Sequence, residues 1–210
     1  EEILADTRRL LPEHVLEALA GEAFTRLDSL GKKVVQALAI MGTPISPIAI
    51  NYLLESYLPG LDSEPILKRL LNMQFVRKQG GNFSLHAVDR EYALSRIPPD
   101  ELNDQGMNNP PFTQRALFHR AANFYRDIRK PQNEWNTLDD LTPQIREFDL
   151  RCHGKEYEPA LRLLLTFDFD YLLRWGHYRL MANFHERVHG QLQDQKLQQL
   201  HLANLGTAYY

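Results

Sequence analysis

Apolar residues recur at spacings of three and four along most of this chain, which is the pattern of amphipathic helices. Segments with this pattern are bounded by residues that start or stop helices, above all proline and glycine. They cover residues 4–19, 29–42, 48–58, 64–73, 113–130, 141–152, 156–167, 169–175, 178–190 and 194–210. The pattern therefore predicts a mainly α fold.

Capping residues define two boundaries in the first half. We expect Ser29 to be the N-cap of the helix that Gly42 ends, because serine accepts a free N–H and glycine tolerates a left-handed turn. Ser46 and Pro47 are expected as N-cap and first residue of the next helix, since a proline there loses no helical hydrogen bond.

One stretch departs from the helical pattern. Two short runs, residues 75–79 and 82–86, flank Gly80-Gly81, and paired glycines accept the positive φ angles of a tight hairpin turn. Counting outward from the turn predicts a register for the two strands. The expected pairs are Lys78–Phe83, Arg77–Ser84, Val76–Leu85 and Phe75–His86.

Composition and charge narrow the function classes. The chain has 210 residues, of which 43% are hydrophobic and 24% charged, as in ordinary globular proteins. Its 24 basic and 27 acidic residues give a net charge of -3, which argues against extended contact with nucleic acid. The longest apolar stretch, residues 37–50, contains two prolines and is shorter than the ~20 residues that span a bilayer, so no membrane partner is expected.

Cys152 is the only cysteine, so the chain cannot form an internal disulfide. This fits the reducing environment of the cytoplasm, where we expect the protein to work. With only Arg151 and His153 beside it, we expect Cys152 to be an inert thiol.

Residues 85–93 read LHAVDREYA and lie on the second predicted strand and the helix expected after it. This string resembles the winged-helix segment of STAND-class signalling ATPases, which include the NB-ARC proteins. The resemblance implies that His86 holds the histidine position of a Met-His-Asp-type motif and contacts the β-phosphate of ADP. Leu85 holds the preceding apolar position, Ala87 stands where the acid would be, and Arg77 is a weaker candidate for the same phosphate.

Residues 202–210 read LANLGTAYY and resemble the first helix of a tetratricopeptide repeat. Leu205, Gly206 and Tyr209 match the Leu-Gly-x-x-Tyr core, in which the glycine lets two helices approach closely. Upstream, Gly154 and Gly176 begin similar openings, but they lie 22 residues apart, against a repeat period near 34. We therefore expect degenerate, repeat-like helices.

Together the two resemblances imply an order of domains. Residues 1–28 would be the helical tail of a preceding domain, 29–97 a winged helix, 98–112 a linker, 113–153 a helical connector and 154–210 truncated tetratricopeptide-like helical repeats, an α-solenoid region. The chain starts and stops within helical patterns, so we expect a piece of a longer protein.

The implied function is that of a non-catalytic regulatory segment of a STAND-type ATPase. The winged helix would respond to the nucleotide state of a preceding nucleotide-binding domain, and the repeats would sense a protein ligand. This chain has no phosphate-binding loop, because the stretch at Gly31-Lys32-Lys33 lacks the upstream glycine and the hydroxyl residue. ADP or ATP with magnesium is therefore expected only in the intact parent.

A winged helix could instead bind DNA as a transcriptional regulator. The helix over residues 64–73 would then enter the major groove and the hairpin would contact the backbone. The side chains in question are Lys68, Arg69 and Asn72 on the helix and Arg77, Lys78 and Asn82 on the hairpin.

Residues 185–189 spell His-Glu-x-x-His, the signature of zinc peptidases. The spacing places His185 and His189 on one helix face, with Asp194 and His201 as the possible third ligands. Arg187 interrupts the usual uncharged pattern and no further motif follows. We therefore expect a solvated helix face, without a metal.

Overall fold

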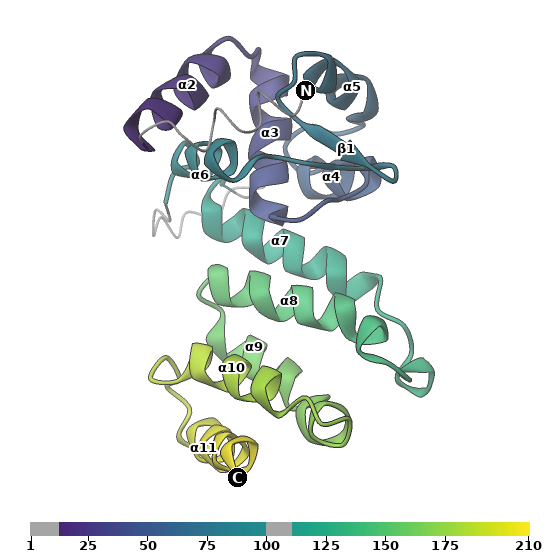
Figure 1. Ribbon diagram of the computed structural model, residues 1–210, viewed down its shortest axis with the longest axis vertical. Helices are drawn as coiled ribbons and strands as arrows, with labels where there is room; N and C mark the ends of the chain where they lie inside the picture. The colour runs from purple at the N-terminus through teal and green to yellow at the C-terminus, as the bar shows by residue number, and fades with distance from the viewer. Residues whose placement is uncertain (1–12, 100–110) are drawn as a thin grey trace. The chain divides into compact units, whose positions relative to one another are not determined.

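The structure, a computed structural model, describes residues 13–99 and 111–210 (Figure 1). The chain divides into two compact units between Leu117 and Phe118, inside one helix. Residues 1–12 of the predicted N-terminal tail and residues 100–110 of the predicted linker lie outside the described residues.

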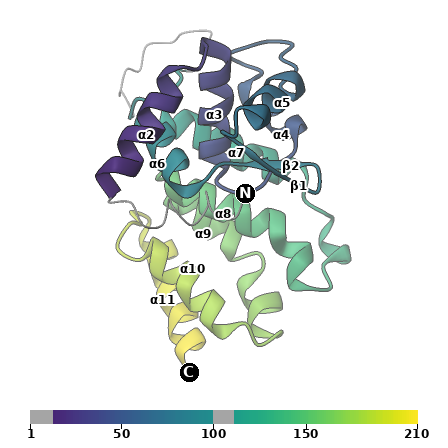
Figure 2. The ribbon, with the colours of Figure 1, turned by 45° about the horizontal axis from the view of Figure 1, so that its top comes forward.

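In its described part, the first unit is helical with one hairpin. Its elements are α2 (Glu13–Thr25), α3 (Ser29–Met41), α4 (Pro47–Leu54), α5 (Glu64–Asn72), β1 (Arg77–Gln79), β2 (Asn82–Ser84), α6 (Ala87–Ser95) and the first turn of α7 (Gln114–Asp127). Helix α3 packs against α4, α5 and α6, and α2 packs against α6 (Figures 1 and 2). Val34, Val35 and Leu38 on α3 are fully or almost fully buried, so α3 is the core of this unit.

The caps of α3 differ from the prediction at one end. Asp28, not Ser29, is the N-cap, and its side chain accepts the N–H of Gly31. Serine and aspartate are both favourable N-cap residues, and Asp28 is favoured at this position because its carboxylate also pairs with Arg69. Gly42 ends the helix as predicted, with a left-handed φ of 67° and its N–H donated to the carbonyl of Leu38.

The hairpin has the predicted turn and a shorter ladder. Gly80 and Gly81 have φ angles of 55° and 86°, as a tight primed turn requires. The observed pairs include Lys78–Phe83 and Arg77–Ser84, which confirms the predicted register.

The two outer pairs, Val76–Leu85 and Phe75–His86, were predicted wrongly, since β1 begins at Arg77 and β2 ends at Ser84. The N–H of Phe75 is instead donated to the carbonyl of Leu70 and closes the end of α5.

A third extended segment joins the hairpin. Ile45, between α3 and α4, forms an antiparallel bridge with Phe83, and the two residues exchange backbone hydrogen bonds of 3.0 and 2.8 Å. Both side chains are buried. The hairpin is therefore tied to the start of the helical core as well as to its own turn.

The second unit is helical throughout its described residues. After the rest of α7 come η1 (Gln132–Glu134), η2 (Leu138–Leu141), α8 (Thr142–His153), α9 (Tyr157–Leu164), the π-helix η3 (Asp168–Leu173), α10 (Tyr178–Val188) and α11 (Gln195–Tyr209). Consecutive helices pack together, α8 on α9, α9 on α10 and α10 on α11.

Aromatic side chains fill the middle of this unit. The ring of Phe184 lies 4.8 Å from that of Phe148 and 6.4 Å from that of Phe167, centroid to centroid. All three side chains are buried, whereas Phe169 and Tyr178 are exposed, so the aromatic residues of this unit divide between the core and the surface.

Candidate functional site

His86 lies where the chain leaves the hairpin. It is the N-cap residue of α6, in an extended conformation, and its carbonyl accepts the N–H of Arg90 at 2.9 Å. The side chain is half-buried. Ala87 is exposed, and the acid in the first turn of α6 is Asp89, which is buried.

Arg77 is exposed on β1, opposite Ser84. Because the ladder ends at Ser84, strand pairing does not carry His86 to the face of the ribbon that Arg77 occupies, as the longer predicted strand would have done. The structure therefore places the two candidate phosphate contacts on different elements, a strand and a helix start.

The exposed face of α5 carries paired charges. The ammonium of Lys68 lies 2.8 Å from Glu64, and Arg69 bonds the carboxylate of Asp28 at 2.7 Å. Binding to a phosphate backbone would require both cations to give up these carboxylates. This arrangement weighs against DNA recognition by α5.

The histidines of the His-Glu-x-x-His motif form a chain of contacts with a third histidine. Nδ1 of His185 lies 3.2 Å from Nδ1 of His201, and Nδ1 of His189 lies 3.0 Å from Nε2 of His201. The far nitrogen of His185, Nε2, lies 3.2 Å from the carboxylate of Asp168 on η3. We call Asp168, His185, His201 and His189 the histidine chain.

This geometry differs from that of a zinc site. His185 and His189 approach opposite nitrogens of His201, so the three rings do not converge on one point. Within residues 13–99 and 111–210, no group of three or more His, Cys, Asp or Glu side chains is placed to hold a metal ion. The motif glutamate, Glu186, instead accepts a hydrogen bond from the hydroxyl of Tyr209, and this contact raises the pKa of that tyrosine.

The expectation of a solvated helix face was wrong for His185, which is 0% exposed. A signal in the sequence was available, because His185 shares its helix face with Met181 and Val188, four residues before and three after. His201, 2% exposed, is buried as well, and only His189 of the three is exposed.

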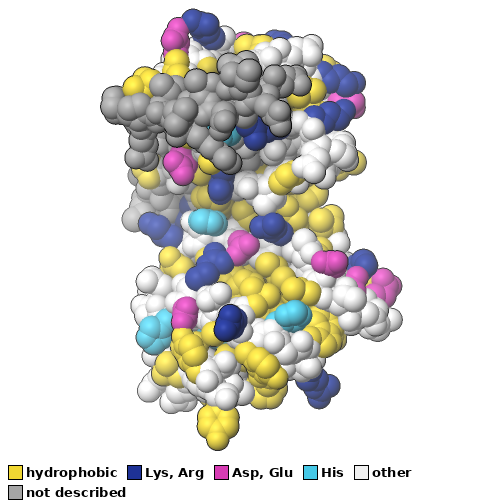
Figure 3. Space-filling view, viewed as in Figure 1, with side chains coloured by type: hydrophobic (Ala, Val, Ile, Leu, Met, Phe, Trp, Pro, Cys, Tyr) yellow, Lys and Arg dark blue, Asp and Glu magenta, His cyan; other side chains and the backbone are white. Residues whose placement is uncertain are grey.

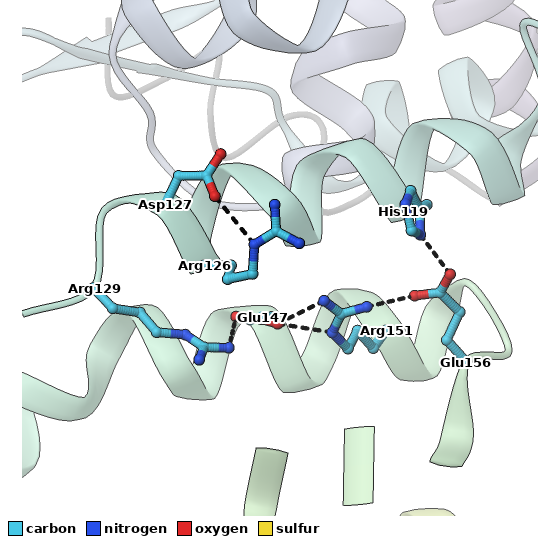
Figure 4. Close-up of polar contacts among 7 residues, drawn as sticks. All are labelled: His119, Arg126, Asp127, Arg129, Glu147, Arg151 and Glu156. Atoms are coloured by element: carbon cyan, nitrogen blue, oxygen red, sulfur yellow. Dashed lines mark hydrogen bonds and ion pairs between the residues drawn. The ribbon is translucent and has the colours of Figure 1, made fainter. Parts of the chain in front are cut away.

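A second polar cluster links α7, α8 and α9, and sequence reasoning missed it. Figure 4 shows Glu147 between the guanidinium groups of Arg129 and Arg151, and Glu156 between Arg151 and His119. Glu147 and Arg151 are only 1% and 9% exposed, so their charges are balanced inside the protein. Burial raises the pKa of Glu156, but its bonds to His119 and Arg151 outweigh this effect and leave the pKa lowered.

The structure agrees with the expectation for Cys152 and differs from the one for Gly206. Burial raises the pKa of the Cys152 thiol to about 12, in agreement with the expected inert thiol. At Gly206 an added Cβ would meet no atom within 4 Å, so the close helix approach implied by the repeat motif is not seen there. The close approach occurs at Gly154, where a Cβ would lie 3.3 Å from Cβ of Phe118.

Comparisons with known proteins add no family. No protein-family model, curated protein or solved structure matches the chain. None of the described helices combines the length and the apolar character that crossing a membrane requires.

Proposed function

We propose that this chain is a non-catalytic regulatory and protein-interaction segment of a STAND-type signal-transduction ATPase in the cytoplasm. Residues 29–97, within the first unit, would be a winged helix that responds to the nucleotide state of a preceding domain. The observation that carries the proposal is the bridge between Ile45 and Phe83. It gives the order helix, extended segment, two helices and hairpin, which is the order expected of a winged helix.

His86 is the residue that would contact nucleotide in the intact protein. A neutral imidazole offers one N–H donor, and the free N–H groups at the start of a helix favour an anion nearby. His86 stands at such a start, as the N-cap of α6. Arg77 would add a weaker, longer-range attraction. ADP or ATP, with magnesium, would supply the phosphate charge, and the nucleotide-binding domain would hold it.

The second unit would recognise a protein ligand through its repeat-like helices. Figure 3 shows hydrophobic side chains gathered over α8 to α10, interrupted by charged groups and histidines. The exposed large hydrophobic residues of this unit include Phe169, Tyr178, Leu200 and Leu202. Such side chains are typical of surfaces that bind other proteins.

The test is ADP retention by the full-length protein that contains this chain. We expect His86→Ala to lower the ADP that remains bound after gel filtration by about tenfold, the value of one hydrogen bond to a charged group. Arg77→Ala should have a smaller effect in the same direction. Lys78→Ala is the matched control, since the Lys78 ammonium lies over the Phe83 ring, 5.3 Å from its centroid. Equal retention in the wild type and His86→Ala would refute the nucleotide role.

The DNA alternative is tested with the same preparations. We expect no duplex binding beyond weak, non-specific association. Affinity that falls steeply with salt and is weakened by Lys68→Ala would contradict the proposal, because it would assign α5 to the major groove.

A further inference from the structure

The histidine chain joins three elements of the second unit, η3, α10 and α11. It runs from the buried Asp168, 1% exposed, through His185 and His201 to the exposed His189. Asp168 also accepts the side-chain amide of Asn204 on α11 at 2.7 Å and the N–H of Phe169 at 2.7 Å. The buried end of the chain is thus held by several donors.

When all three rings are neutral, the contacts fix the tautomer of each histidine in the histidine chain. The Asp168 carboxylate accepts only, so Nε2 of His185 carries a hydrogen. Neutral His185 then has a lone pair on Nδ1, and His201 must donate to it from its own Nδ1. Nε2 of His201 is left as an acceptor, and His189 donates to it from Nδ1. One tautomer of each neutral ring satisfies all three contacts.

The same count limits how many protons the chain can take up. Each of the two contacts between rings needs one hydrogen and tolerates only one, because two facing N–H groups repel. The only free position is Nε2 of His189. The closed chain therefore holds at most one additional proton, whereas three separated histidines can take up three.

Helix α11 depends on this chain for its docking. Its buried residues are Leu197, His201 and Ala208, so a histidine occupies the centre of a small apolar contact. Burial lowers the pKa of His201 to about 4, and a positive charge on His185 or His189 would act in the same direction. The neutral form of His201 is thus the form that fits between the helices.

Other charged groups near α11 contact its ends. Glu186 on α10 meets Tyr209 near the C-terminal end. From α9, Glu158 accepts the backbone N–H groups of Gln193 and Asp194, and Arg162 pairs with Asp194 at the N-terminal end. Among the described residues, only Asp168 contributes a carboxylate contact to the histidine rings themselves.

We propose that α11 is an acid-released helix, which stays docked while the histidine chain holds no more than one additional proton and separates from α10 and η3 when more are taken up. Release then consumes at least two protons. The ratio of open to closed protein should rise by about 100-fold per pH unit once the pH is below the ordinary histidine range near 6.5.

Hydrogen exchange of the whole 210-residue chain measures this release. After correction for the intrinsic rate, we expect exchange in α11 to accelerate by about 100-fold between pH 6 and pH 5. Exchange in helices α8 and α9 should accelerate by less than about threefold, since neither helix contributes a residue to the histidine chain. Protection of α11 that is independent of pH would overturn the proposal.

Variants assign the effect to the chain. In His189→Gln the amide can accept as well as donate, so Nε2 of His201 becomes the position that takes the additional proton. The closed state then still holds at most one additional proton and the open state two, so the acceleration should fall from about 100-fold to about tenfold per pH unit. His177→Gln is the control, since His177 is the N-cap residue of α10 and lies outside the chain. An equal effect of both variants would contradict the assignment.

The tautomers provide a test that needs no variant. Nitrogen NMR of the imidazole rings at pH 7 should find hydrogens on Nδ1 of His201, Nδ1 of His189 and Nε2 of His185. A hydrogen on Nε2 of His201, or titration of His201 near pH 6.5 with α11 still protected, would exclude the mechanism.

Discussion

Arg69 Nη2 lies 2.7 and 2.8 Å from the two carboxylate oxygens of Asp28, and the same carboxylate accepts the N–H of Gly31. One side chain therefore caps α3 and ties it to α5. We expect Asp28→Ala to lower the thermal midpoint of the protein more than Arg69→Ala does, because only the first variant also removes the cap. Thermal unfolding followed by circular dichroism compares the two.

The loss of stability caused by Asp28→Ala should depend on pH. The Gly31 N–H and Arg69 lower the pKa of Asp28 below its ordinary value of 3.8. A carboxylate with a lowered pKa stabilises the folded state above pH 3.8, and the contribution is lost as the pH falls through the folded-state pKa. The gap between wild type and Asp28→Ala should close in acid. A gap that does not narrow as the pH falls below 3.8 would show that the charge is not the cause.

Gly42 combines a left-handed backbone with a close neighbour. Its φ is 67°, and an added Cβ would lie 2.6 Å from the guanidinium of Arg90. Gly60 has φ 72° with nothing within 4 Å, so it is a matched control. We expect Gly60→Ala to cost about 1 kcal/mol in the free energy of unfolding and Gly42→Ala clearly more. Equal costs in urea denaturation would mean that Arg90 moves aside freely.

Glu147 is the buried carboxylate of the cluster between α7 and α8. Its replacement by alanine leaves Arg151 and Arg129 without their shared counter-ion, and breaking a buried pair typically costs 3–5 kcal/mol. We expect Glu147→Ala to destabilise the second unit by about that amount. Asp170→Ala is the control, since its pair with Arg174 is exposed and spans 3.7 Å. That variant should change stability by less than about 0.5 kcal/mol in the same denaturation assay.

Gly206 sits inside α11 with open space around its Cα. Since glycine weakens a helix interior relative to alanine, we expect Gly206→Ala to stabilise α11 by about 0.5–1 kcal/mol in this chain. Amide exchange in α11 at pH 7 measures the change. Destabilisation would indicate that another helix needs the open space that glycine leaves at this position.

The hairpin shows how far local sequence carries the prediction. Gly80 and Gly81 specify the turn, and the turn fixes the register of Arg77 opposite Ser84. The bridge between Ile45 and Phe83 was not predictable in this way, because one isolated pair of residues, 38 positions apart, leaves no periodic signal in the sequence. Most helix positions followed from the apolar pattern for the same local reason, but α6 is not among the segments that it predicted, and α4 ends at Leu54, before the expected residue 58.

The polar clusters required tertiary structure. Glu147 and Arg151 are spaced as an ordinary helical ion pair, and only the packing of α7 and α9 makes them buried. The histidine chain was partly visible, since the spacing of His185 and His189 does place them on one face. The bridging role of His201 depends on how α11 packs, which its own weakly patterned sequence does not specify.

The backbone bonds between Ile45 and Phe83 have a mechanical consequence. A force applied to the hairpin reaches the connection between α3 and α4 directly, without passing through flexible side chains. If a neighbouring molecule displaces the hairpin, either the start of α4 moves with it or the two backbone hydrogen bonds between Ile45 and Phe83 break. A displacement of the hairpin turn therefore strains the connection between α3 and α4 at Ile45.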